Sequence, residues 1–512
     1  MEREEHLKTV MLKASALMLA VMLAVKLLGY VFHIAFVRLF SQDSYGTYVY
    51  ALSLGLFMCG LIPSISAAVA RYVAYYRGGG DMKAVGSTIL NGLVLTLLFA
   101  ALASALAFAA YGVGLLPIGF NTFLFSVGVM CLNLLVFVFI GVISGYRKPE
   151  VNTYFTLLQQ ALRVAALFVV AAAAASFDSL LALQLFAFLL SSAIIAYYSL
   201  RKYGVGSGLD LKIGKELFRF GSYSVLQTTS YNMLSWTNIL LLQSFLGAAV
   251  VGIYNIAWMA SNVPLLLFLV VLQIFSPVAA ELFGSGSRER LSRLASYLFE
   301  AFFLLFLPVF IAVTLFAREL LTVFVPAEYL AGAVTMQVLS IGGFFFGLAL
   351  LFVDMTTAEG RADINARNTG LAAAVNVALA WLLIPLYGIV GAAAAALISS
   401  MLLLALSYNH IRRVIPMTYS LRRLVGIVAS SLLSVVVAWT VKALVDSTVL
   451  SLILSSAALA LAYVASLLLT KSLRQEDVEL AEAAMERFRV PVSASQAVLS
   501  ALKRGVYSRI SL

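Results

Sequence analysis

The feature that most constrains the fold is a series of apolar stretches, each of about 20 residues, that recur from Met11 to Thr470. Each stretch is long enough to cross about 30 Å of hydrocarbon as a helix. Hydrophobic residues make up 62% of the 512 residues and charged residues 11%, which leaves too little polar surface to cover a soluble globule. No large polar block interrupts the series, so there is no room for a soluble catalytic domain. The sequence predicts an all-α polytopic membrane protein.

The spacing of the stretches predicts about 14 transmembrane helices. The first stretch lacks a small-residue cleavage site and a second follows closely, so we expect a permanent span rather than a signal peptide. The spans are expected at residues 14–39, 46–72, 86–111, 121–146, 153–175, 179–200, 221–245, 249–279, 292–316, 331–356, 367–386, 388–409, 424–444 and 447–470.

The formal net charge of +11 follows the membrane topology rather than a nucleic-acid surface. Alternate loops carry most of the lysine and arginine residues, whereas the opposite loops hold only Arg38, Arg318 and Lys442, each at the end of a span. Basic loops remain in the cytoplasm. We therefore expect a multi-pass protein of the cytoplasmic membrane with both termini in the cytoplasm, and no nucleic-acid partner.

Two short internal repeats indicate a duplicated bundle. The motif Gly46–Ala51 at the second span returns as Gly252–Ala257 at the eighth, and Ser144–Arg147 before the fifth span returns as Glu359–Arg361 before the eleventh. Spans 1–6 and 7–12 are thus predicted to form two pseudo-symmetric six-helix lobes around a central cavity, with two extra C-terminal helices.

This organisation predicts five segments along the chain. They are an N-terminal lobe (1–201), a basic amphipathic linker on the cytoplasmic surface (202–220), a C-terminal lobe (221–413), the two added spans (414–471) and a cytoplasmic tail (472–512).

Four stretches carry a resemblance to a known family. The run Arg38–Tyr48 resembles the entry motif of polysaccharide exporters of the oligosaccharide flippase type, and Ala70–Val73 resembles the end of their second helix. Asn376–Val377 and Leu383–Ala393 are similar to their eleventh and twelfth helices. Lipid II flippases and multidrug extruders belong to the same superfamily. The resemblance implies two six-helix lobes whose cavity opens alternately to each side.

Ionisable residues at bilayer depth are costly and are therefore candidates for function. Lys26 and Arg163 lie near the middle of spans 1 and 5, at depths that we expect to be similar, and Arg38 closes span 1. His33 lies on the same helical face as Lys26, although a lone histidine among aromatic residues is more often a packing residue. Every acidic residue among the first 200 positions falls outside the predicted spans. We expect a cationic interior without a neutralising carboxylate.

The repeat predicts what the second lobe offers at related positions. Lys26 corresponds to Asn232, and Arg163 corresponds to a position beside Asn376. These two amides are candidates for contact with sugar hydroxyls, and asparagine equally joins membrane helices by hydrogen bonds. A cavity that is cationic on one side suits a phosphate head, because arginine presents a fork of donors and lysine a mobile charge.

We therefore predict a flippase that moves a lipid-linked oligosaccharide, on a polyprenyl phosphate or diphosphate, from the cytoplasmic to the outer face by alternating access. A cation-coupled multidrug antiporter is the nearest alternative, but it needs an intramembrane carboxylate. A membrane glycosyltransferase or polymerase would need larger loops with carboxylates. No catalytic residue, metal or cofactor is expected, because transport breaks no bond. Cys59 and Cys131 lie inside predicted spans and are expected to be packing residues. The partners are the glycolipid, membrane lipids and an undefined coupling ion, H⁺ or Na⁺, and the protein is expected to be a monomer.

Overall fold

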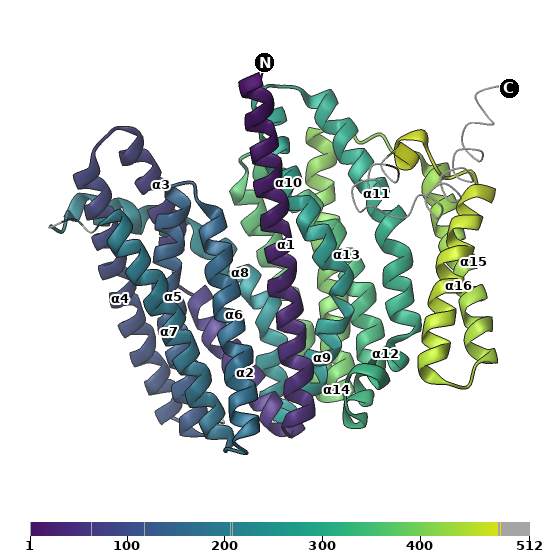
Figure 1. Ribbon diagram of the computed structural model, residues 1–512, viewed down its shortest axis with the longest axis horizontal. Coiled ribbons are helices and arrows are strands. Elements are labelled where there is room, and N and C mark those ends of the chain that lie inside the picture. The colour runs from purple at the N-terminus through teal and green to yellow at the C-terminus, as the bar shows by residue number, and fades with distance from the viewer. Residues whose placement is uncertain are drawn as a thin grey trace. The chain divides into compact units, whose positions relative to one another are not determined.

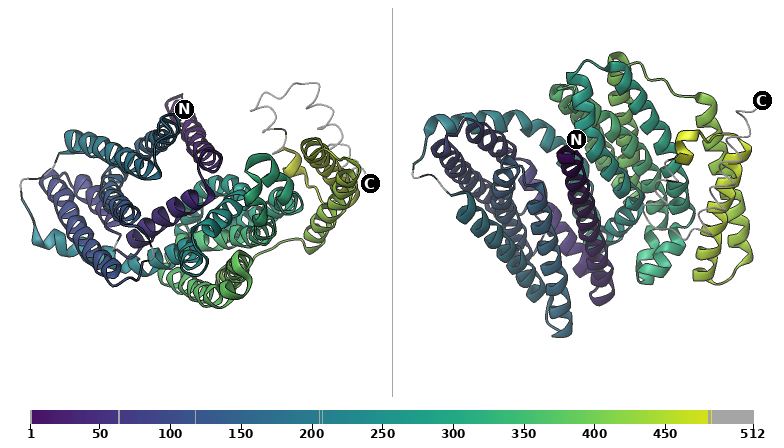
Figure 2. Two further views of the ribbon diagram at one scale, coloured as in Figure 1. Left: turned by 90° about the horizontal axis from the view of Figure 1, so that it is seen from below. Right: turned by 45° about the horizontal axis from the view of Figure 1, so that its top comes forward.

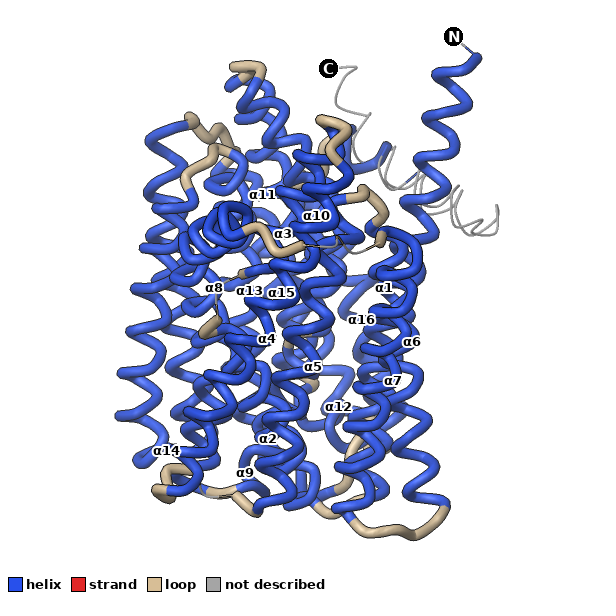
Figure 3. Tube along the Cα trace, turned by 90° about the vertical axis from the view of Figure 1, so that its left-hand side faces the viewer, coloured by secondary structure: helices blue, strands red, loops and turns tan. Residues whose placement is uncertain are grey.

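The computed structural model describes residues 2–62, 64–116, 118–204, 206, 208–479 and 482. These residues form the helices α1 to α16 and one 3-10 helix, η1 (Ala327–Gly332), and the described part of the chain contains no strand (Figure 3). Among the described residues, eleven helices are long and apolar enough to cross a membrane, or twelve if the bent pair α2 and α3 counts as one span. The all-α membrane class is confirmed, and the expected number of about 14 crossings stays a prediction.

The chain divides into two compact units, and the first contains residues 1–259, 325–332 and 362–399. Its centre is α5 (Phe120–Gly145), which packs most extensively against four neighbours (Figure 1). These neighbours are α2 (Gln42–Gly60), α3 (Ile65–Gly78), α4 (Met82–Gly112) and α7 (Phe177–Tyr203). On another side, α1 (Glu2–Leu39) packs along α6 (Pro149–Ala172), and α8 (Leu211–Leu246) contacts α2, α3 and α4.

The helix α14 (Ala362–Val414) consists of two segments that fold back on one another. At Gly388 the backbone leaves the helical region, with φ 59° and ψ −135°. A Cβ atom on Gly391 would lie only 2.2 Å from the carbonyl oxygen of Leu383, a proximity that a straight helix could not give. The turn lies at the boundary predicted between the spans 367–386 and 388–409.

The second unit contains residues 260–324, 333–361 and 400–512. In it α11 (Arg288–Leu315) packs against α10 (Val263–Gly284), α13 (Ala333–Ala358) and α15 (Leu421–Leu444) (Figure 2). Phenylalanine side chains from α10, α11 and α13 fill its core, among them Phe268, Phe302 and Phe344. The hairpin of α15 and α16 (Thr448–Leu469) and the short α12 (Ala317–Phe324) complete this unit.

Two predicted spans differ from the structure because each contains a break. The expected span 46–72 is divided between α2 and α3, whose axes meet at 50°. The expected span 249–279 is divided between α9 (Ala248–Ser261) and α10, and Pro264 lies in the first turn of α10. Proline suits a first turn because its ring presets φ and no N–H is needed there. The boundaries of the two lobes stay a prediction.

Candidate functional site

The two copies of the repeated motif meet at their glycines. A Cβ atom on Gly46 of α2 would lie 1.7 Å from the carbonyl oxygen of Ala248, and one on Gly252 of α9 would lie 3.2 Å from that of Gln42. Only hydrogen at the α carbon of residue 46 allows the two backbones to approach so closely. Beside this crossing, Asn255 donates a hydrogen bond of 2.7 Å to the Tyr45 hydroxyl. The motif therefore begins with glycine in both copies for a reason of packing.

Arg163 of α6 lies next to this crossing and is held by neutral groups. Its Nη2 donates to the Tyr48 hydroxyl at 2.8 Å, and its Nη1 donates to Oε1 of Gln160 at 3.0 Å. Its Cζ lies 4.8 Å from the ring centre of Phe32 and 5.4 Å from that of Phe188, so aromatic faces contact the guanidinium. Its Nε is buried and has no hydrogen-bond partner among the described residues. The positive charge is thus stabilised without being neutralised.

The contacts between α1 and α6 fix the position of Lys26 relative to Arg163. A Cβ atom on Gly29 of α1 would lie 3.7 Å from Nε2 of Gln160 of α6. One turn further along both helices, the Phe32 ring contacts the guanidinium of Arg163. Lys26 is therefore nearly two turns before the level of Arg163, about 9 Å along the helix axis. This corrects the expectation of similar depth. Lys26 is exposed, and in the described part of the chain it forms no ion pair.

The related position in the second repeat is occupied by amides. The repeat pairs Tyr48 with Tyr254, and the Tyr254 hydroxyl accepts a hydrogen bond of 3.2 Å from Asn238. Asn376 in turn donates to Oδ1 of Asn238 at 3.2 Å. The equivalent tyrosines thus contact a guanidinium in one repeat and, in the other, the neutral amide of Asn238, which is itself bonded to Asn376.

Asn376 is only 1% exposed, and both ends of its amide are hydrogen-bonded, because its Oδ1 also accepts from Ser399 at 3.4 Å. Asn232 donates to the Thr228 carbonyl at 2.9 Å and accepts from the Trp236 indole at 3.2 Å. The contacts of Asn376 join α14 to α8 and link the two segments of α14, whereas those of Asn232 join successive turns of α8. The predicted roles of both residues toward sugar hydroxyls stay predictions.

The other two predicted residues lie further along α1. His33 and the Tyr45 hydroxyl form a hydrogen bond of 2.9 Å through Nδ1, and the Phe32 ring meets the imidazole edge-on. These contacts agree with the packing role that a histidine among aromatic residues suggests. Arg38 lies exposed in the last turn of α1, near the end of the bundle.

The carboxylates of this region belong to helix ends. Asp81 caps α4 by accepting from the Ala84 N–H, and Asp43, Glu150 and Asp178 lie in the first turns of α2, α6 and α7. A negative charge at a helix N-terminus is stabilised by the free N–H groups and the helix dipole. These acids therefore have structural roles at positions away from Arg163.

The residues that hold Arg163 were not among the predicted site residues. Tyr48 and Gln160 are its hydrogen-bond partners, and neither was singled out. A signal for Tyr48 was available, since the repeat places a tyrosine at the same position of both copies. For Gln160, its place almost one turn before Arg163 on the same helix was the only indication.

An apolar helical bundle, in which eleven helices of the described residues are long and apolar enough to cross a membrane, defines a multi-pass membrane protein. The particular family follows from comparison: the chain belongs to the polysaccharide biosynthesis protein family, whose sequence model matches residues 11–283. The predicted resemblance is confirmed.

Individual relatives agree with this membership. The chain is 23% identical over 190 residues to the probable low-salt glycan biosynthesis flippase Agl15 of Haloferax volcanii, a match that covers 37% of this chain and 40% of that protein. The chain spans less than half the length of the curated relatives that it matches.

Solved structures of two membrane transport proteins share this fold. The lipid II flippase MurJ in an inward closed conformation matches with a TM-score of 0.72 and 14% identity, over 88% of this chain and 98% of that one. An inward-facing multidrug MATE family transporter matches with a TM-score of 0.63 and 14% identity, over 81% and 99% of the two chains.

Proposed function

We propose that this protein is a flippase that turns a lipid-linked oligosaccharide from the cytoplasmic to the outer face of the cytoplasmic membrane. The head group, a sugar chain on a polyprenyl phosphate or diphosphate, crosses through a central cavity that opens alternately to each side. The lipid tail stays in the bilayer. Membership of the polysaccharide biosynthesis family and the similarity to a probable glycan flippase support this substrate class.

The observation that carries the proposal is the state of Arg163. Its partners are a phenol, an amide and two aromatic rings, and its buried Nε has no partner among the described residues. A buried donor without an acceptor costs about 1–3 kcal/mol, so an anion that reached it would gain a charge-assisted bond. Lys26, about 9 Å away along α1, supplies a second and more mobile charge for the same head group.

The test is a flipping assay with the purified protein in vesicles that contain a polyprenyl diphosphate oligosaccharide. Arg163→Gln and Lys26→Gln should each slow flipping at least tenfold, because each removes a charge that offsets phosphate away from bulk water. Arg163→Lys should recover part of the rate, since the charge returns without the fork of donors.

The matched control is Lys83→Gln, which makes the same change in net charge at an exposed position in the first turn of α4. It should flip at the rate of the unmodified protein. Normal flipping by both Arg163→Gln and Lys26→Gln would refute the cationic site. If instead both variants fail to accumulate in the membrane, these residues serve stability, and the site has to be sought elsewhere.

A further inference from the structure

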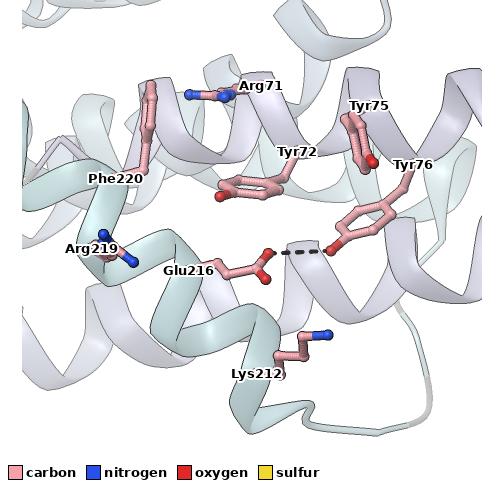
Figure 4. A pocket seen from close by; sticks show the side chains of 8 residues that line it. All are labelled: Arg71, Tyr72, Tyr75, Tyr76, Lys212, Glu216, Arg219 and Phe220. Atoms are coloured by element: carbon pink, nitrogen blue, oxygen red, sulfur yellow. Dashed lines mark hydrogen bonds between the residues drawn. The ribbon is translucent and has the colours of Figure 1, made fainter.

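A second site lies at the end of α3 and the start of α8, outside the site of Arg163. A pocket of about 690 Å³ opens between these two helices (Figure 4). The first turns of α8 are held in place because Ile213 and Leu217 are buried in the core with residues of α3 and α4. The first turns of α8, predicted as a surface linker, are thus docked onto the bundle. The pocket opens on the side that carries the basic loops.

The charges around the pocket favour an anion. Arg71, Lys212 and Arg219 line it, and Glu216 is the one carboxylate among the described lining residues. The Arg71 guanidinium lies over the Phe220 ring, with 4.6 Å from Cζ to the ring centre. An arginine held by its face keeps its N–H edge available for acceptors in the plane. Within the described residues, no acceptor occupies that edge of Arg71 or the ammonium of Lys212.

The middle of the pocket favours a ring with hydroxyl groups. Tyr72 and Tyr76 stack with ring centres 6.1 Å apart, and Figure 4 shows the Tyr72 ring next to Glu216. An aromatic face packs well against the C–H face of a sugar. Glu216 accepts a hydrogen bond of 3.4 Å from the Tyr76 hydroxyl through Oε2, and its other oxygen can accept from a sugar hydroxyl.

We propose that this pocket binds a glycosyl phosphate, with the phosphate at Arg71, Arg219 and Lys212 and the sugar ring on Tyr72. The inference rests on the proposed function: the bound group is the head of the lipid-linked oligosaccharide, held at the cytoplasmic surface before it enters the membrane. The pocket is then a loading site, separate from the intramembrane charges of Lys26 and Arg163.

The experiment measures binding of α-D-glucose 1-phosphate to the full chain in detergent by saturation-transfer NMR, with methyl glucoside and glycerol 1-phosphate as comparison probes. Glucose 1-phosphate should show transfer to its ring protons and bind at least tenfold more tightly than either comparison probe. Tyr72→Leu should abolish the transfer to the ring, and Arg71→Gln should weaken binding at least tenfold.

Two controls locate the effect. Lys215→Gln removes one positive charge, as Arg71→Gln does, at an exposed position of α8 outside the pocket lining. This variant should bind glucose 1-phosphate normally. Arg163→Gln should also bind normally, which separates this site from the intramembrane one. Because binding in detergent requires no transport, a failed flipping assay with intact binding would overturn the flippase and leave the pocket standing.

Two results would overturn the pocket. Binding of glucose 1-phosphate that is unchanged in both Tyr72→Leu and Arg71→Gln would place the probe elsewhere. Equal affinity for glycerol 1-phosphate, with no effect of Tyr72→Leu, would identify a site for ordinary phospholipid heads, and the sugar specificity would be refuted.

Discussion

At the scale of single residues, Arg163 illustrates how a bundle can keep a cation without a carboxylate. Two aromatic rings cover its faces, while a phenol and an amide accept from its edge. A carboxylate in the same place would form an ion pair that competes with any anionic ligand. The neutral environment therefore leaves the charge of the guanidinium uncompensated, as the proposed contact with phosphate requires.

Gly46 gives a prediction about stability at the same scale. A methyl group there would overlap the Ala248 carbonyl at 1.7 Å, so Gly46→Ala should force α2 and α9 apart. We expect a loss of about 1–3 kcal/mol or more, seen as a lower apparent unfolding midpoint of the protein in detergent. Gly112→Ala is the matched control, because no atom lies within 4 Å of its would-be Cβ. Equal unfolding midpoints for Gly46→Ala and Gly112→Ala would contradict the close approach of α2 to α9.

At the scale of elements, a buried cluster of charges joins α15 to α11 and to the segment after α16. Arg423 is 5% exposed and pairs with Glu300 of α11 and with Asp477. Its Nε also donates to the Ser472 carbonyl at 3.0 Å, and Arg474 forms a further ion pair of 2.8 Å with Glu300. All charges in the cluster are matched, so the hairpin of α15 and α16 is attached by more than apolar packing.

Removal of one member should release this hairpin. Arg423→Ala would leave two buried carboxylates without their main partner, a change that typically costs about 3–5 kcal/mol. We expect a lower unfolding midpoint and faster proteolytic cleavage beyond residue 420 in the purified protein. The neighbouring Arg422→Ala, at an exposed position, should behave like the unmodified chain. If both variants were cleaved at the same rate, the cluster would not anchor the hairpin.

The elements also show which parts of the structure the sequence predicts. Spans were placed within a few residues because hydropathy is a property of consecutive residues, as for α5, α6 and α16. The break between α2 and α3 was missed, although a proline in the sequence at position 63 was a signal for it. The break before α10 had a similar signal in Pro264.

The site was predicted less completely, for a physical reason. Depth and charge select Arg163 and Lys26 as candidates from single positions, but the contact of Arg163 with Tyr48 joins helices that are far apart in sequence. Hydropathy gives no information about which faces of two apolar helices meet. The register of α1 against α6 also depends on side-chain packing, so the depth of Lys26 relative to Arg163 was wrong.

At the scale of the whole molecule, the distribution of basic loops predicts the orientation. After both native cysteines are replaced by serine, Gly79→Cys and Ser285→Cys should react with an impermeant maleimide only from the cytoplasmic side. Leu115→Cys and Asp446→Cys should react only from outside, since these exposed positions lie in the opposite set of loops. Labelling is compared between right-side-out and inverted vesicles. Reaction of Gly79→Cys and Leu115→Cys from the same side would overturn the topology.

The turn at Gly388 has a consequence for how the chain is made. The two segments of α14 are joined by one non-helical residue, and Gly391 lies against Leu383, so no loop separates them. Once both segments have been synthesised, the connection is too short for one to stay in water while the other lies in the bilayer. We therefore expect the two predicted spans within residues 362–414 to enter the membrane as a pair.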